Sequence, residues 1–172
     1  MNTGKRPARR LLLAAVLLGA TLPAIPQAAT TFTVEVLVFR NGADTGALPD
    51  SVRPPVDGDE LTASAVSARR LGGSVARLNG NGMRVLGHGA WRQEPAAWRS
   101  RRGVSAARLG AAGISGKVIL ERGSQSLHLG LDIVVEDGGK RYRVDEVRPV
   151  KAGEIQYFDH PAIGVLAIAT EG

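Results

Sequence analysis

The sequence predicts an α+β domain with a mainly antiparallel β-sheet of about six or seven strands and one principal helix after the first strand. Three observations support this prediction. A β-branched and aromatic run, "TFTVEVLVF", comes early, apolar residues at helical spacing follow it, and a series of alternating segments with short turns fills the second half. Because these late connections are too short for parallel crossovers, we expect their strands to pair antiparallel.

The first expected strand covers residues 31–39 and is rich in residues that favour β-structure. Alternation divides its side chains between two faces. One face carries Phe32, Val34, Val36 and Val38, and the other carries Thr33, Glu35, Leu37 and Phe39. Since both faces are largely apolar, we expect a central strand rather than an edge strand.

The expected helix follows a polar, glycine- and proline-rich segment, residues 41–59, which has no periodicity and is predicted to be a surface excursion. An apolar stripe at helical spacing then runs through Leu61, Ala65, Ala68, Leu71, Val75 and Leu78. Asp59 is the expected cap, and "NGNG" at residues 79–82 is the expected stop.

The remaining strands are expected at residues 83–93, 114–121, 126–135, 141–147, 155–158 and 162–169. Residues 94–113 are irregular and rich in arginine. Gly138 and Gly139 are expected to form a hairpin turn, because two-residue glycine turns match the twist of paired strands.

The N-terminus has the three-part layout of a secretory signal peptide, predicted at residues 1–29. Lys5, Arg6, Arg9 and Arg10 precede an uncharged apolar stretch, and small residues and prolines follow. Cleavage is expected near Ala29, or alternatively after Ala24. The apolar stretch is about half the roughly 20 residues that span a bilayer, so we expect no permanent membrane anchor after cleavage. The mature part, residues 30–172, is then a single domain in a bacterial periplasm.

Removal of this signal changes the charge balance. The chain has 22 Lys and Arg against 16 Asp and Glu, a net charge of +6, and four of the basic residues lie in the signal. The mature part keeps 18 basic and 16 acidic residues, so we expect no nucleic-acid partner. The absence of cysteine excludes a disulfide framework, a thiolate metal site and a lipidated N-terminal cysteine.

Metal binding and catalysis lack sequence support. His88, His128 and His160 are 40 and 32 residues apart and do not have the spacing of a zinc motif. The chain has no GxSxG nucleophile elbow. Glu154 and Asp159 could act as an acid and base only if the fold set the right separation, and such loop carboxylates are usually solvated. We therefore expect no metal, no cofactor and no enzymatic activity.

The segment Asp159, His160 and Pro161 precedes the last apolar run and has two interpretations. Proline restricts the preceding residue to extended geometry, and an Asp side chain can accept backbone N–H groups in a turn. These properties favour a corner that leads into a strand over a binding site. Gly164 would allow a backbone or a large ring to approach closely.

Aromatic and basic residues in the irregular segment indicate a binding surface. Trp91 and Trp98 flank "RQEPAA", and four arginines lie beside them: Arg92, Arg99, Arg101 and Arg102. A Trp ring stacks on sugars, and guanidinium groups bind carboxylates in a bidentate manner. A glycan polymer with peptide carboxylates would use both. Trp91 is alternatively a core residue of its strand, and Trp98 is the stronger surface candidate.

Three segments of the chain resemble the CsiV family, periplasmic peptidoglycan-binding proteins of Gram-negative bacteria. They are "FTVEVLVF" after the signal, "RVLGHGAWRQ" after the helix, and "EIQYFDHPAIGVLAI" near the end. The chain departs from the family at Gln156, where His is common, and in a shorter first loop. The resemblance implies a noncatalytic role and no established catalytic residues. The matching positions are His88, Trp91, Arg92, Gln93, Tyr157, Asp159 and His160.

The resulting hypothesis is an exported, noncatalytic peptidoglycan-binding protein that supports cell-wall synthesis. Its ligand-binding candidates are the matching positions together with Trp98, Arg99, Arg101 and Arg102. One alternative is a periplasmic adaptor that binds cell-wall synthesis proteins through a sheet edge or its long loop. Another is a muropeptide hydrolase.

Overall fold

The structure is a computed structural model that describes residues 1, 30–41, 60–67 and 70–172. The expected signal peptide, most of the expected surface excursion, the Asp59 cap and Ala68 lie outside the described residues. Among the described residues are one α-helix, α1 (Gly72–Gly80), and one 3-10 helix, η1 (Ala106–Leu109). The strands are β1 (Phe32–Arg40), β2 (Ala63–Ala65), β3 (Arg84–Gln93), β4 (Ala96–Ala97), β5 (Gly103–Ser105), β6 (Ile114–Arg122), β7 (Leu127–Asp137), β8 (Lys140–Val150), β9 (Gln156–Asp159) and β10 (Ile163–Glu171).

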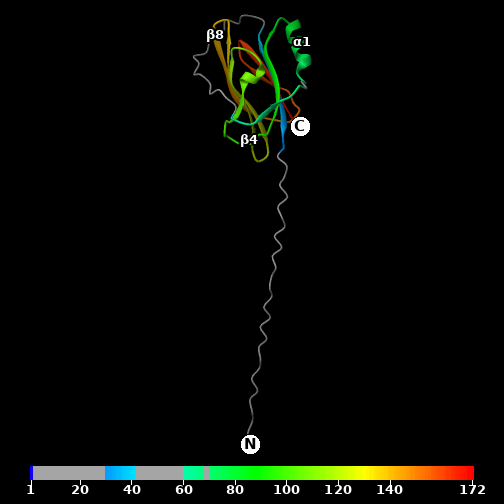
Figure 1. The fold of residues 1–172 in the computed structure, drawn as a ribbon, viewed down its shortest axis with the longest axis vertical. Coiled ribbons are helices and arrows are strands. Elements are labelled where there is room, and N and C mark those ends of the chain that lie inside the picture. The colour runs from blue at the N-terminus through cyan, green and yellow to red at the C-terminus, as the bar shows by residue number, and fades with distance from the viewer. Residues whose placement is uncertain (2–29, 42–59, 68–69) are drawn as a thin grey trace.

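The strands form two sheets. Sheet A has the order β2-β3-β1-β10-β9, and sheet B has the order β4-β6-β7-β8 with β5 paired to β6. Every strand pair is antiparallel except β4 with β6. Helix α1 and strand β8 lie on opposite sides of the domain (Figure 1). The α+β, mainly antiparallel class is thus confirmed, but the described residues form ten strands in two sheets instead of six or seven in one.

Strand β1 is a central strand of sheet A, as the apolar residues on both of its faces predicted. It pairs with β3 on one side and with β10 on the other. Phe32, Val34, Val36 and Val38 pack into a core that sheet B completes with alternate residues of β7, Leu127, Leu129, Leu131, Ile133 and Val135. The two sheets therefore bury their apolar surfaces against each other as a β-sandwich.

The opposite face of β1 contacts helix α1. Leu37 and Phe39 form a second buried cluster with Leu71 and Ile168, and Val75 and Leu78 of the helix region pack against it. The molecule therefore has three layers: helix α1, sheet A and sheet B.

The start of the helix differs from the prediction. The apolar stripe from Leu61 predicts a helix over residues 61–78, but α1 begins at Gly72. Leu61 and Ala63 pack against the inter-sheet core, and β2 pairs with the end of β3. This segment thus packs against the sheets instead of forming the first turns of a helix. Packing decides the outcome, because most helical stability in proteins comes from packing and not from the local sequence pattern. The expected stop is confirmed, since Asn81 caps the helix.

The expected hairpin turn in sheet B is also confirmed. Gly138 and Gly139 connect β7 to β8 with φ values of 59° and 75°, as a type I′ hairpin requires. Between β6 and β7 the N–H of Gly123 donates to the carbonyl of Ser126 at 2.9 Å. These short turns set the register that brings loop 98–102 over the outer face of sheet B.

Candidate functional site

The Asp-His-Pro segment lies at the corner between β9 and β10: Asp159 ends β9, and residues 160–162 form the turn of the hairpin. The His160 N–H donates to the Ile163 carbonyl at 3.1 Å, and the Asn41 side chain donates to the carbonyls of His160 and Pro161 at 3.2 Å each. The turn places β10 between β1 and β9, inside sheet A. The segment therefore forms a corner that leads into a strand, as predicted.

The side chains in this corner have different roles from those expected. His160 Nδ1 accepts the Ala162 N–H at 3.1 Å, whereas Asp159 accepts the hydroxyl of Tyr157 at 2.7 Å. The acceptor for the turn N–H is thus His160 instead of Asp159. Gly164 has the expected close approach, because a Cβ there would lie 2.7 Å from Phe39 Cε2.

Tyr157 is the exposed aromatic residue of this hairpin, with a fractional exposure of 45%. Its ring stacks on Phe39 at 6.3 Å between centroids. Partial burial, the hydrogen bond to Asp159 and the negative charge of Asp159 raise the pKa of Tyr157 to about 12. The phenol therefore stays protonated and serves Asp159 as a hydrogen-bond donor.

We expect the tyrosinate absorbance of Tyr157 to titrate near pH 12 in a Tyr142→Phe background, which removes the second tyrosine of the chain. Because the folded pKa lies above the ordinary value of 10, this group stabilises the fold below pH 10 and loses that contribution as the pH rises toward 12. Asp159→Asn should lower the pKa only partly, because burial is the largest cause. Titration near pH 10 without that substitution would contradict this account.

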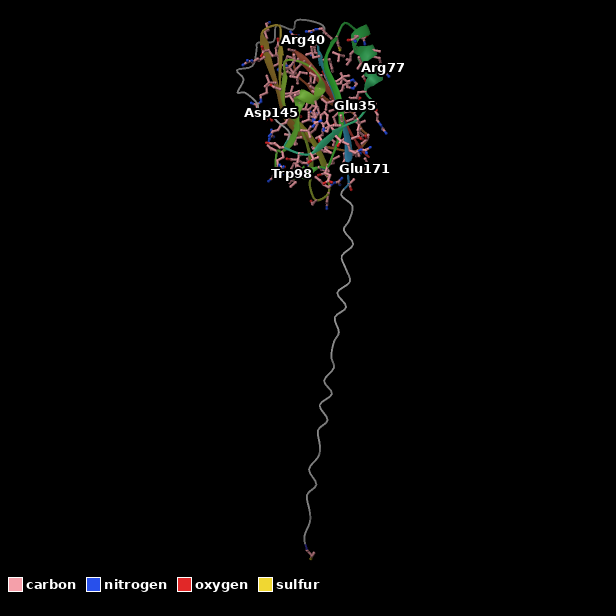
Figure 2. The ribbon with its side chains drawn as sticks, in the orientation of Figure 1. Glu35, Arg40, Arg77, Trp98, Asp145 and Glu171 are labelled. Carbon is pink, nitrogen blue, oxygen red and sulfur yellow. The ribbon has the colours of Figure 1, made fainter. Side chains whose placement is uncertain are left out.

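His88 lies on the helix side of sheet A and contacts a buried acid. Its Nε2 lies 2.7 Å from Glu35 Oε1, and Glu35 is 2% exposed. Glu35 also accepts the backbone N–H groups of Arg70 at 2.5 Å and Leu71 at 2.9 Å, directly before α1. Its side chain lies on the side of the domain that carries α1 (Figure 2). This arrangement holds the start of the helix against β1 and β3.

Trp91 and Gln93 lie on the other face of β3, inside the sandwich. Trp91 has no exposed surface, and its Nε1 donates to Gln93 Oε1 at 2.7 Å. Gln93 in turn donates to the Glu94 carbonyl at 3.2 Å. Trp91 is therefore a core residue of β3, which is the alternative expected for it from the sequence. Buried side chains cannot contact a surface ligand directly, so we assign Trp91 and Gln93 to the scaffold. His88 keeps 11% of its side chain exposed, and we assign it to the scaffold because its Nε2 contacts the buried Glu35 carboxylate.

Trp98, Arg99 and His128 form a partly exposed surface on sheet B. We name these three residues the Trp98 platform. The Trp98 ring packs on His128 with centroids 3.8 Å apart and planes tilted by 31°, and it remains 42% exposed. The Arg99 guanidinium lies 5.7 Å from the Trp98 ring centroid. Because His128 alternates with the core residues of β7, this platform lies on the outer face of sheet B.

A buried acid that the sequence did not reveal fixes the platform. Glu121 is 1% exposed, and it accepts the N–H of Arg99 at 3.1 Å and the N–H of Arg101 at 2.5 Å. Both arginines have a positive φ, 61° and 52°, which is uncommon for residues other than glycine. The Glu121 carboxylate compensates for this backbone strain, so the loop is held in one conformation before any ligand arrives.

Arg101 and Arg102 are occupied by contacts within the protein. Arg101 forms an ion pair with Asp145 at 2.5 Å, and Arg102 donates to the backbone carbonyl of Glu60. Glu60 also forms an ion pair with Lys117 at 3.1 Å. These contacts reduce the number of donors that either arginine can offer to a ligand. Of the four arginines near Trp98, the structure places Arg99 on the platform and Arg92 elsewhere.

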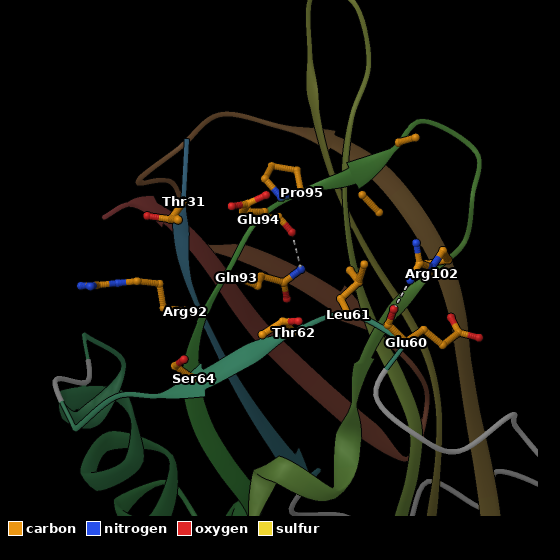
Figure 3. A pocket seen from close by; sticks show the side chains of 12 residues that line it. Thr31, Glu60, Leu61, Thr62, Ser64, Arg92, Gln93, Glu94, Pro95 and Arg102 are labelled. Atoms are coloured by element: carbon orange, nitrogen blue, oxygen red, sulfur yellow. Dashed lines mark hydrogen bonds between the residues drawn. The ribbon is translucent and has the colours of Figure 1, made fainter. Parts of the chain in front are cut away.

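Arg92 lies at a cleft of about 700 Å³ between the edges of the two sheets (Figure 3). Strand β2 and the end of β3 form one wall, and β4 and Arg102 form the other. Leu61 and Ala96 supply apolar lining, and the hydroxyls of Thr31, Thr62 and Ser64 supply polar lining. A cleft of this size can hold a small organic ligand or a few peptide residues.

The candidate residues therefore fall into separate places. Tyr157 contacts Phe39 on the helix side of sheet A, whereas Trp98 lies on the outer face of sheet B, so the two exposed aromatic residues face opposite sides. In the described part of the chain, no group of three or more His, Asp or Glu residues could hold a metal ion. The same residues include no helix that is long and apolar enough to cross a membrane.

Comparison of the chain with protein-family models, with curated proteins and with solved structures finds no match.

Proposed function

We propose that this protein is an exported, noncatalytic peptidoglycan-binding protein that supports cell-wall synthesis in the periplasm. The observation that carries the proposal is the Trp98 platform: a partly exposed ring packed on His128 with a guanidinium beside it. A fixed aromatic face suits the apolar face of a sugar ring, and a guanidinium suits a carboxylate. Peptidoglycan presents both groups in alternation.

The rigidity of the platform supports a binding role further. Loop 98–102 is fixed by two backbone hydrogen bonds to the buried carboxylate of Glu121. A preformed surface has a lower ordering cost on association than a flexible one. The neighbouring cleft extends the surface on which a polymer could lie, because Arg102 of the same loop lines it.

We expect Trp98→Ala to weaken binding to purified sacculi about tenfold, because it removes the stacking face. Arg99→Gln should weaken binding less, since the Trp98 ring remains. The measurement is co-sedimentation of the protein with sacculi over a range of concentrations.

Tyr157→Ala is the matched control, because it removes an aromatic residue of similar exposure from the opposite side of the molecule. Unchanged pelleting of the Trp98→Ala protein would reject the platform as the binding surface. Absence of pelleting by the unaltered protein would reject the proposed function itself.

A second candidate function, an adaptor for wall-synthesis proteins, is favoured by the exposed end of β9. Ile155 is 54% exposed and Tyr157 45% exposed at this edge of sheet A. Arg148 limits strand addition there, because its Nη1 already occupies the Tyr157 carbonyl at 2.9 Å. Capture of wall-synthesis proteins that Tyr157→Ala abolishes, without sacculus binding, would favour the adaptor.

A further inference from the structure

The rim of the cleft carries two opposite charges on one side of one strand. Arg92 and Glu94 are two residues apart at the end of β3, and extended backbone turns such residues to the same side. In Figure 3 both side chains point to one side of the strand and Gln93 points to the other. A positive and a negative side chain thus both line the cleft from the same side of β3.

Neither charge is compensated by an ion pair within the described part of the chain, although Arg101 and Lys117 nearby both have carboxylate partners. The Arg92 Nε lies beside the backbone of Gly172, but no ion pair forms there. Arg92 and Glu94 therefore differ in this respect from Arg101 and Lys117. Each keeps its hydrogen-bonding capacity for a group outside the protein.

The surroundings favour a small polar ligand over a purely apolar one. Thr31 and Ser64 bring hydroxyl groups to the same rim, and Leu61 and Ala96 line the cleft with apolar surface. A ligand with a charged head and a short aliphatic chain matches this combination, because the head meets the rim and the chain enters the apolar part.

We propose that Arg92 and Glu94 form a subsite for a zwitterionic amino-acid group, with the guanidinium on its carboxylate and the Glu94 carboxylate on its ammonium. This inference rests on the proposed function and specifies it. The stem peptide of peptidoglycan carries such a group where its third residue is diaminopimelate, whose side chain ends in an ammonium and a carboxylate on one carbon. A stem with lysine at that position keeps the ammonium and lacks the carboxylate.

The test compares two soluble stem tripeptides that differ only in the third residue, diaminopimelate or lysine, by calorimetric titration of the purified protein. We expect the diaminopimelate peptide to bind about tenfold more tightly, because it alone has a carboxylate on the carbon that bears the side-chain ammonium, where Arg92 and Glu94 can contact both groups. Arg92→Gln should remove this preference by weakening the diaminopimelate peptide alone. Glu94→Gln should weaken both peptides, since both carry the ammonium.

Arg77→Gln, on the exposed surface of α1, and Glu154→Gln, before β9, are the matched charge controls and should leave both affinities unchanged. Free diaminopimelate is titrated in parallel, and tighter binding of the free amino acid than of the stem would overturn the assignment to a stem peptide. The subsite would also be overturned if neither peptide binds, or if Arg92→Gln leaves the preference intact. Sacculus pelleting that still depends on Trp98 would then show that the proposed function stands without this subsite.

Discussion

Glu35→Ala is expected to destabilise the fold by about 3–5 kcal/mol, because removal of one partner from a buried polar cluster leaves the others unsatisfied. Glu35 is 2% exposed and accepts three hydrogen bonds, from the N–H groups of Arg70 and Leu71 and from His88. In the variant, two backbone donors at the start of α1 and one imidazole nitrogen lose their acceptor. The measurement is urea unfolding followed by circular dichroism.

Two further substitutions at acidic positions separate this effect from a general loss of charge. Glu35→Gln keeps one acceptor oxygen and should lose less stability than Glu35→Ala. Glu154→Ala removes a carboxylate that is exposed and only distantly paired, at 3.9 Å from Lys151, and should change the free energy of unfolding little. A Glu35→Ala protein within about 1 kcal/mol of the unaltered one would contradict the anchoring role of Glu35.

Gly116→Ala is expected to cost about 3 kcal/mol or more, for two physical reasons that act together. Gly116 lies in β6 opposite Ile133 with a φ of 96°, where L-residues are strained. A Cβ at this position would overlap the backbone carbonyl of Asp132 and lie 3.0 Å from Ile133 Cα. Backbone atoms cannot move aside as a flexible side chain can, so the β6–β7 pairing would have to shift.

Gly139→Ala provides the control for backbone strain alone. Gly139 has a φ of 75° in the hairpin turn, and no atom lies within 4 Å of a Cβ built there. Its substitution should therefore cost only about 1 kcal/mol. Equal losses for Gly116→Ala and Gly139→Ala, measured by the same unfolding experiment, would show that the close approach to Asp132 contributes nothing.

The longer strands could be predicted from the sequence because each presents a periodic pattern of its own. Both faces of β1 are apolar, and the two glycines at 138 and 139 mark the β7–β8 hairpin. Strands β2, β4 and β5 have three residues or fewer, which is too short for alternation to appear. The division into two sheets could not be predicted either. The short spacing between strands indicates that neighbouring strands pair antiparallel, but it does not show which strands belong to which sheet.

The candidate site was predicted in part, for similar reasons. Trp98 was identified as a surface residue because it is an aromatic residue in a polar segment, and the structure leaves it 42% exposed. Glu121 and Glu35 were not identified as anchors, because their donors are backbone N–H groups distant in sequence and carry no residue signature. Likewise His128, which supports Trp98, could be paired with it only once the register of β6 and β7 was known.

Acrylamide quenching of tryptophan fluorescence can show whether Trp98 itself contacts the wall ligand. The chain has two tryptophans, Trp98 at 42% exposure and Trp91 fully buried, so quenching by acrylamide reports mainly on Trp98. We predict that saturating soluble muropeptides protect the protein from quenching, and that a Trp98→Phe protein is quenched little with or without ligand. Quenching that stays unchanged at saturation would show that Trp98 does not contact the ligand.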